Sequence, residues 1–136
     1  MASVISGDFS GVIDKFCTKS APIGWQTAIR KIAIEVFSRI IFGTPVREGR
    51  ARGNWQATIG TPAQGILDVV DPAGNATVQA MIAEVSKWTP EDDLPAFITD
   101  NLPYIQRLNE GWSKQAPANY IEQVIADLGG IARMVV

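Results

Sequence analysis

The longest regular pattern in the chain is a helical stripe of apolar residues between Trp25 and Phe42. Apolar residues recur there every three or four positions, which is the spacing of one face of an α-helix. The stripe consists of Trp25, Ile29, Ile32, Val36 and Ile40, widened by Ala33, Phe37 and Ile41. Gly43 and Pro45 then end the pattern. The sequence predicts a main core helix with an apolar face broad enough to need a sheet or another helix against it.

Three shorter stretches have the same helical spacing. Residues 8–19 predict a short amphipathic helix, and residues 75–85 predict another, with Asn75 as its N-cap. A C-terminal helix is predicted from Tyr120 to Leu128, where the pair Gly129-Gly130 would stop it. The remaining residues, 131–136, are mostly apolar. We expect them to add an edge strand or to contact a neighbouring molecule.

Apolar residues that alternate with polar ones predict β-strands. Residues 54–60 alternate and place Trp55, Ala57 and Ile59 on one face. Further strands are predicted at residues 65–70 and 96–99, with a turn after the first of these. Because the strands are unevenly spaced, we predict an α+β fold in one domain, residues 1–136, rather than a doubly wound sheet. A small mixed sheet would pack against the long helix and the C-terminal helix.

Composition excludes several function classes. The chain has 136 residues, of which 46% are hydrophobic and 19% charged, as in a globular domain. It has no histidine, which removes the usual general base and the commonest metal ligand. The single cysteine, Cys17, excludes an internal disulfide and is expected to be a half-buried thiol. No phosphate-binding or nucleophile motif is present, so we expect a protein that is not an enzyme and binds no cofactor or metal.

The N-terminus has no signal-peptide pattern, and no apolar window is long enough to span a bilayer. We therefore expect synthesis in the cytoplasm and no membrane partner. The net charge of -2 argues against binding of a polyanion by the whole surface.

A local concentration of arginine follows the main helix. Residues 46–53 contain Arg47, Arg50 and Arg52 with one acid, Glu48, and no apolar period, so they predict an exposed loop or arm. Exposed guanidinium groups could contact phosphates, with Trp55 stacking on a base. The acid within the cluster and the acidic chain favour a solvated loop or salt bridges to another protein.

Residues 101–118 combine turn formers, aromatics and charges. Pro103, Gly111 and Pro117 shape the backbone. Between them lie two large aromatics and a mixed-charge set, namely Tyr104, Trp112, Arg107, Glu110 and Lys114. None of these residues is a nucleophile or a metal ligand, so we predict a shape that another surface recognises. Tyr104 is expected in a shape-holding core, Trp112 and Lys114 at an interface, and Glu110 in a turn-locking or intersubunit role.

The four tryptophans differ in context. Trp25 and Trp55 lie on predicted core faces. Trp88 and Trp112 lie in loops rich in proline, glycine and charge, and exposed aromatics of that kind are enriched at interfaces. Burial beneath the loop itself is the alternative for both.

Two blocks of the chain form a pattern together, namely residues 44–56, TPVREGRARGNWQ, and residues 101–118, NLPYIQRLNEGWSKQAPA. They resemble the tail-component family of tailed bacteriophages, whose members include neck, head-tail joining and tail-completion proteins. The family shows Thr-Pro-Val, an acid and a hydroxyl residue, Gly-Arg and Asn-Trp, and later Asn-x-x-Tyr, Gly, Ser and Ala-Pro-x-Gly. This chain departs from it with Arg47 and Glu48 in the first block and with Asn119 in place of the last glycine. Asparagine is the non-glycine residue that best tolerates a left-handed backbone.

The resemblance implies a virion structural protein of the tail or neck. It would form a ring of six copies around the DNA channel at the head-tail junction, between portal-side head-closure or adaptor proteins and tail-side proteins. Whether the arginine arm contacts DNA or a neighbouring subunit stays open. Interface or channel candidates are Arg47, Arg50, Arg52, Trp88, Glu110, Trp112 and Lys114. The alternative is a small nucleic-acid-binding domain that uses the Arg47–Arg52 loop.

Overall fold

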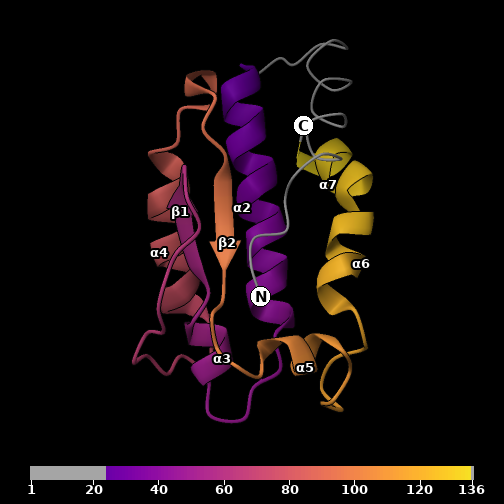
Figure 1. Ribbon diagram of the computed structural model, residues 1–136. Helices are drawn as coiled ribbons and strands as arrows, with labels where there is room; N and C mark the ends of the chain where they lie inside the picture. Colours follow the sequence, from indigo (N-terminus) through magenta and orange to yellow (C-terminus); the bar gives the residue numbers. More distant parts are fainter. Residues whose placement is uncertain (1–23, 136) are drawn as a thin grey trace.

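The computed structural model describes residues 24–135 of the chain. The helix predicted over residues 8–19, and Cys17 with it, lies outside this range. The predicted α+β class is confirmed, as is the packing of the long helix against a small sheet. In Figure 1, α2 (Trp25–Gly43) runs through the middle of the molecule. The strands and α4 (Asn75–Ser86) lie on one side of it, with α6 (Tyr120–Ala126) and α7 (Leu128–Val135) on the other.

Helix α2 forms where the apolar stripe predicts it. It contributes eight buried residues, namely Ala28, Ile29, Ile32, Ala33, Val36, Phe37, Ile40 and Ile41. Contacts reach α4, α6 and α7, so this one helix joins both sides of the core. Trp25 departs from the prediction, because 39% of its surface is exposed at the start of the helix.

The described sheet has two antiparallel strands, β1 (Gln56–Ile59) and β2 (Ala96–Thr99). Gln56 pairs with Thr99 and Ile59 with Ala96, across a connection that contains α4 and the 3-10 turn η1 (Pro90–Asp92). Helix α4 packs against β1 and α2. The predicted strands at residues 54–60 and 96–99 therefore exist.

The strand predicted at residues 65–70 does not form, and the sheet is antiparallel rather than mixed. Residues 61–70, which we call the ribbon, are irregular. Gly60, just before the ribbon, and Gly65, within it, have left-handed backbone conformations, at φ 90° and 85°. Side chains take up its backbone groups in place of a neighbouring strand. Asn54 Oδ1 accepts from Leu67 N at 2.7 Å, and Asn101 Nδ2 donates to Ala63 O at 2.9 Å.

The first turn of α4 is capped by Asp71 rather than by the predicted Asn75. Asp71 Oδ1 accepts from Gly74 N at 3.1 Å, and Oδ2 accepts from Thr77 N at 2.8 Å and Thr77 Oγ1 at 2.7 Å. Burial raises the pKa of Asp71, but these hydrogen bonds and the charge of Arg52 outweigh it, so that the pKa lies below its usual value. The capping side chain comes from a residue before Asn75 because the chain turns into the helix at Gly74, which has φ 82°.

The end of the chain differs most from the prediction. Gly129 and Gly130 do not stop the last helix but lie inside α7, and residues 131–135 are helical rather than an edge strand. Glycine weakens a helix by about 1 kcal/mol relative to alanine. Ile131 and Ala132 are 1% and 2% exposed, because α7 packs on α2, and this burial outweighs the low propensity.

Candidate interaction groove

Thr44 holds the first sequence block against two helices. Its Oγ1 donates to Ile40 O at 2.8 Å, accepts from Trp55 Nε1 at 2.7 Å and lies 3.2 Å from the Tyr120 hydroxyl. All of these contacts are buried. Burial raises the pKa of Tyr120 to about 12, so its hydroxyl stays protonated at neutral pH. The Thr-Pro-Val and Asn-Trp elements of the block are therefore structural.

Arg52 also belongs to the fold rather than to a free arm. Its Nη1 donates to Pro72 O at 2.8 Å, and its Nη2 donates to Phe42 O and Thr44 O at 2.9 Å each. The guanidinium thus joins the end of α2 to the turn before α4. A guanidinium group suits this role because it is planar and carries several N–H donors. Since Arg52 already donates to three carbonyls, few of its donors are left for a partner.

The segment predicted as an exposed loop or arm, residues 46–53, is only partly exposed. Arg50–Gly53 form a short helix, α3, and Ala51 and Gly53 are buried. Gly49 turns the chain back at φ 93°, where a Cβ would overlap the Pro72 nitrogen. Arg47 and Glu48 remain exposed at the tip. The segment is a compact turn and not an extended arm.

The second sequence block is held by Asn109, at the end of α5 (Ile105–Asn109). Its Oδ1 accepts from Ile121 N at 3.0 Å, and its Nδ2 donates to both carboxylate oxygens of Glu122, at 2.9 and 2.8 Å. The intervening loop enters α6 through Asn119, which adopts φ 60°. Asn119 thus has the left-handed backbone that an asparagine tolerates.

A single glutamine brings the two blocks together. Gln115 Oε1 accepts from Val46 N at 2.8 Å, and Gln115 Nε2 donates to Val46 O at 2.6 Å. The side-chain amide therefore pairs with the backbone as a neighbouring strand would. Between the blocks lies a groove of about 740 Å³. It is lined by residues 45–51 together with Tyr104, Leu108 and residues 112–115, and we call it the end groove.

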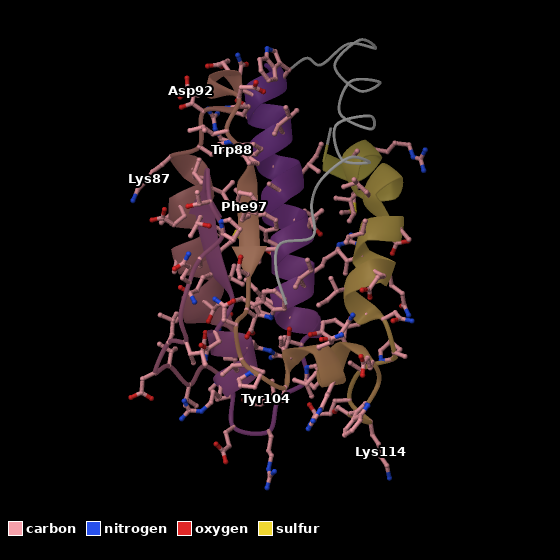
Figure 2. All side chains as sticks on the ribbon, viewed as in Figure 1. Lys87, Trp88, Asp92, Phe97, Tyr104 and Lys114 are labelled. Carbon is pink, nitrogen blue, oxygen red and sulfur yellow. The ribbon has the colours of Figure 1, made fainter. Side chains whose placement is uncertain are left out.

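The end groove combines cations with exposed aromatic rings. Arg47, Arg50 and Lys114 line it with one acid, Glu48, although the whole chain carries a charge of -2. Trp112 is 70% exposed and Tyr104 38% exposed. The Arg107 guanidinium lies 5.0 Å from the centroid of the Trp112 ring and restrains it by a cation-π contact. Tyr104 is thus at the surface rather than in a core, and Figure 2 places it at the same end of the molecule as Lys114.

Trp88 is not part of this surface. Figure 2 shows it at the opposite end of the molecule from Tyr104 and Lys114, and only 7% of it is exposed. Its Nε1 donates to Leu94 O at 2.7 Å, and its carbonyl accepts from Arg30 Nε at 2.6 Å. The ring is covered by its own loop, which was the alternative at the sequence level. We therefore remove Trp88 from the interface candidates.

Glu110 is exposed, but it does not line the end groove. No ion pair in the described part of the chain joins it to Lys114. Sequence reasoning placed Arg47, Arg50, Trp112 and Lys114 in two separate blocks and could not show that they meet. It also missed Gln115, because the only sequence signal is a polar amide in a proline-flanked loop.

Reactive groups do not gather at the groove. Among residues 24–135, no group of three or more histidine, cysteine, aspartate or glutamate residues could hold a metal ion. No helix in that range is long and apolar enough to cross a membrane. What the groove offers chemically is an apolar and cationic surface.

Comparison of the chain with protein families, with curated proteins and with solved structures finds no match.

Proposed function

We propose that the chain is a structural subunit of the neck of a tailed bacteriophage, a head-tail connector or tail-completion protein. In this proposal six copies form a ring around the DNA channel and join head to tail. The ring contacts portal-side head-closure or adaptor proteins on one face and tail-side proteins on the other. The protein acts by docking and catalyses no reaction.

The observation that carries the proposal is the joining of the two signature blocks by Gln115 and Val46. These blocks carry the family resemblance, and they lie 69 residues apart at this contact. Most of their polar groups hold loops in shape, while Trp112 stays 70% exposed on the groove between them. Exposed aromatics beside cations are typical of surfaces that dock other proteins. A site of this kind suits assembly.

A nucleic-acid-binding domain that uses the Arg47–Arg52 loop with Trp55 is less well supported. Trp55 is 3% exposed, with its Nε1 bonded to Thr44, and cannot stack on a base. Arg52 donates to backbone carbonyls. Of the loop arginines, Arg47 and Arg50 line the end groove and Arg52 does not, so the candidate phosphate contacts there are Arg47, Arg50 and Lys114.

Electron microscopy of assembled particles tests the proposal. Particles that carry the protein with a small epitope tag should bind labelled antibody at the head-tail junction, in one ring per particle. Particles made without the protein should have heads and tails that fail to join. Label scattered over the head or absent from purified particles would contradict the proposal.

A further inference from the structure

The ribbon exposes an unusual amount of apolar surface. Four of its residues are large and apolar, and each leaves more than a third of its surface uncovered. They are Ile66 (52%), Leu67 (38%), Val69 (38%) and Val70 (52%). Single exposed apolar residues are common, but a contiguous group marks a surface that another protein covers.

The ribbon is held in place although it belongs to no sheet. Asn54 and Asn101 bond its backbone at Leu67 and Ala63, and Gln56 Nε2 donates to Gly65 O at 3.2 Å. Just beyond its end, Asp71 N donates to Gly49 O at 3.0 Å. A segment ordered in advance loses little conformational entropy when it binds, so these anchors suit a docking element.

The charge of the ribbon is opposite to that of the end groove. Asp68 has a fully exposed side chain, with a relative exposure of 100%. Its contact with Arg50 of the same chain is 3.6 Å long, and an exposed pair of that kind contributes little to stability. The groove carries Arg47 and Lys114 in addition to Arg50. A carboxylate from another copy would therefore meet an excess of cations there.

A copy does not fill its own groove. The lining that the described residues give to the end groove includes no residue of the ribbon. In the view of Figure 1, the connection between β1 and α4 lies on one side of α3 and α5 lies on the other. The ribbon borders the groove at Arg50, through the 3.6 Å contact of Asp68, but it does not line the groove. Contact between them on successive copies is heterologous, which is the kind of contact that builds rings or filaments.

We propose that the ribbon of one copy, with Ile66, Val69 and Val70, docks in the end groove of the next copy. The exposed rings of Tyr104 and Trp112 cover its apolar side chains, and Asp68 lies among the cations of the groove. This inference rests on the proposed function, since it supplies the contact between neighbouring subunits of the ring.

Disulfide trapping tests the contact directly. In a Cys17→Ser background, one variant carries Val70→Cys on the ribbon and a second carries Ser113→Cys in the groove. The two purified full-length chains are mixed at high concentration and oxidised. We expect the mixed dimer of ribbon and groove variants to exceed either symmetric dimer by at least about fivefold, because the contact is directional. As a control, Met134→Cys, which is exposed on α7 outside the groove, should give no enrichment with Ser113→Cys.

The results of trapping distinguish failure of the contact between subunits from failure of the proposed function. A chain with both cysteines should form a ladder of linked copies. A ladder that ends at a fixed number supports both proposals, and one without end supports the contact but contradicts a closed ring. Only symmetric dimers, or no mixed dimer, would overturn the contact even if microscopy of particles still finds a ring.

A charge reversal provides a second readout. Asp68→Lys should weaken self-association by about tenfold or more, measured by analytical ultracentrifugation, since it places a cation opposite three others. Asp92→Lys makes the same change in charge at the end of the molecule that carries Trp88 (Figure 2) and should leave association unchanged. Equal effects of the two variants would overturn the proposed position of Asp68.

Discussion

At the scale of single residues, the Thr44 hydroxyl lies among three buried polar groups. It is fully buried and lies within hydrogen-bonding distance of Ile40 O, Trp55 Nε1 and the Tyr120 hydroxyl. Removal of one buried partner leaves the others without a bond, which costs about 1–3 kcal/mol.

We predict that Thr44→Val lowers the free energy of unfolding by about 1–3 kcal/mol, because Trp55 Nε1 loses its acceptor. Urea titration followed by tryptophan fluorescence measures this change. The matched variant Thr61→Val, at an exposed position, should change stability by less than about 0.5 kcal/mol. Equal effects at the two positions would contradict a structural role for the Thr44 hydroxyl.

We expect Asp100 to make the stability of the folded protein depend on pH. Its side chain is fully buried, and burial raises the pKa from 3.8 to about 7, although a hydrogen bond from Leu102 N opposes the shift. At a pH between these two pKa values, Asp100 is protonated in the folded chain and ionised in the unfolded chain. The contribution of Asp100 to stability is therefore largest below about pH 4 and is lost as the pH rises to about 7.

We predict that Asp100→Asn reduces this loss of stability between pH 4 and pH 7, because asparagine does not titrate. Each pKa unit corresponds to about 1.4 kcal/mol, so the change amounts to a few kcal/mol. Urea midpoints at pH 4.5 and pH 8 measure it in both proteins. The same pH slope in both would show that Asp100 is not the group responsible.

At the scale of elements, α7 shows how packing can outweigh local preference. Gly129 and Gly130 lie within the helix, and a Cβ added at either position would meet no atom within 4 Å. Neither residue has the positive φ at which a side chain is strained. The glycines therefore weaken α7 without a steric reason.

We predict that Gly129→Ala and Gly130→Ala each raise the free energy of unfolding by about 0.5–1 kcal/mol, since alanine restricts the unfolded chain more. Thermal and urea unfolding measure the gain. Gly49→Ala is the opposite control and should destabilise the protein, because φ is 93° there and the Cβ would overlap Pro72. Destabilisation by the α7 variants would contradict the helix.

At the scale of the whole molecule, one end combines the end groove, exposed aromatics and cations. At the opposite end, Figure 2 places Trp88, whose ring is covered, with only 7% of the residue exposed. Trp112 and Trp88 should therefore respond differently to truncation.

We predict that Trp112→Ala changes the free energy of unfolding by less than about 1 kcal/mol, the size of an exposed cation-π contact. The same variant should reduce incorporation into particles at least about tenfold, measured by immunoblotting of purified virions. Trp88→Ala should instead cost about 3–5 kcal/mol of stability through the cavity that it leaves. Normal incorporation of Trp112→Ala would contradict an interface at the groove.

Sequence alone determined the features that depend on neighbours along the chain. The period of apolar residues specifies α2, because one helix face needs only residues three or four apart to agree. Alternation of apolar and polar residues specifies the position of β1 for the same local reason. Asn119 was predictable as well, since few residues accept a left-handed backbone.

Tertiary structure decided whatever depends on contacts between distant residues. Residues 65–70 look like a strand locally, but the amides of Asn54, Gln56 and Asn101 take up their backbone groups and leave them outside the sheet. Helix α7 continues through two glycines because α2 offers it an apolar surface. The end groove lies between two blocks that Gln115 joins by bonding Val46, 69 residues away in the sequence. Local patterns carry no information about such pairings, since their free energy arises only when the folded chain brings the partners together.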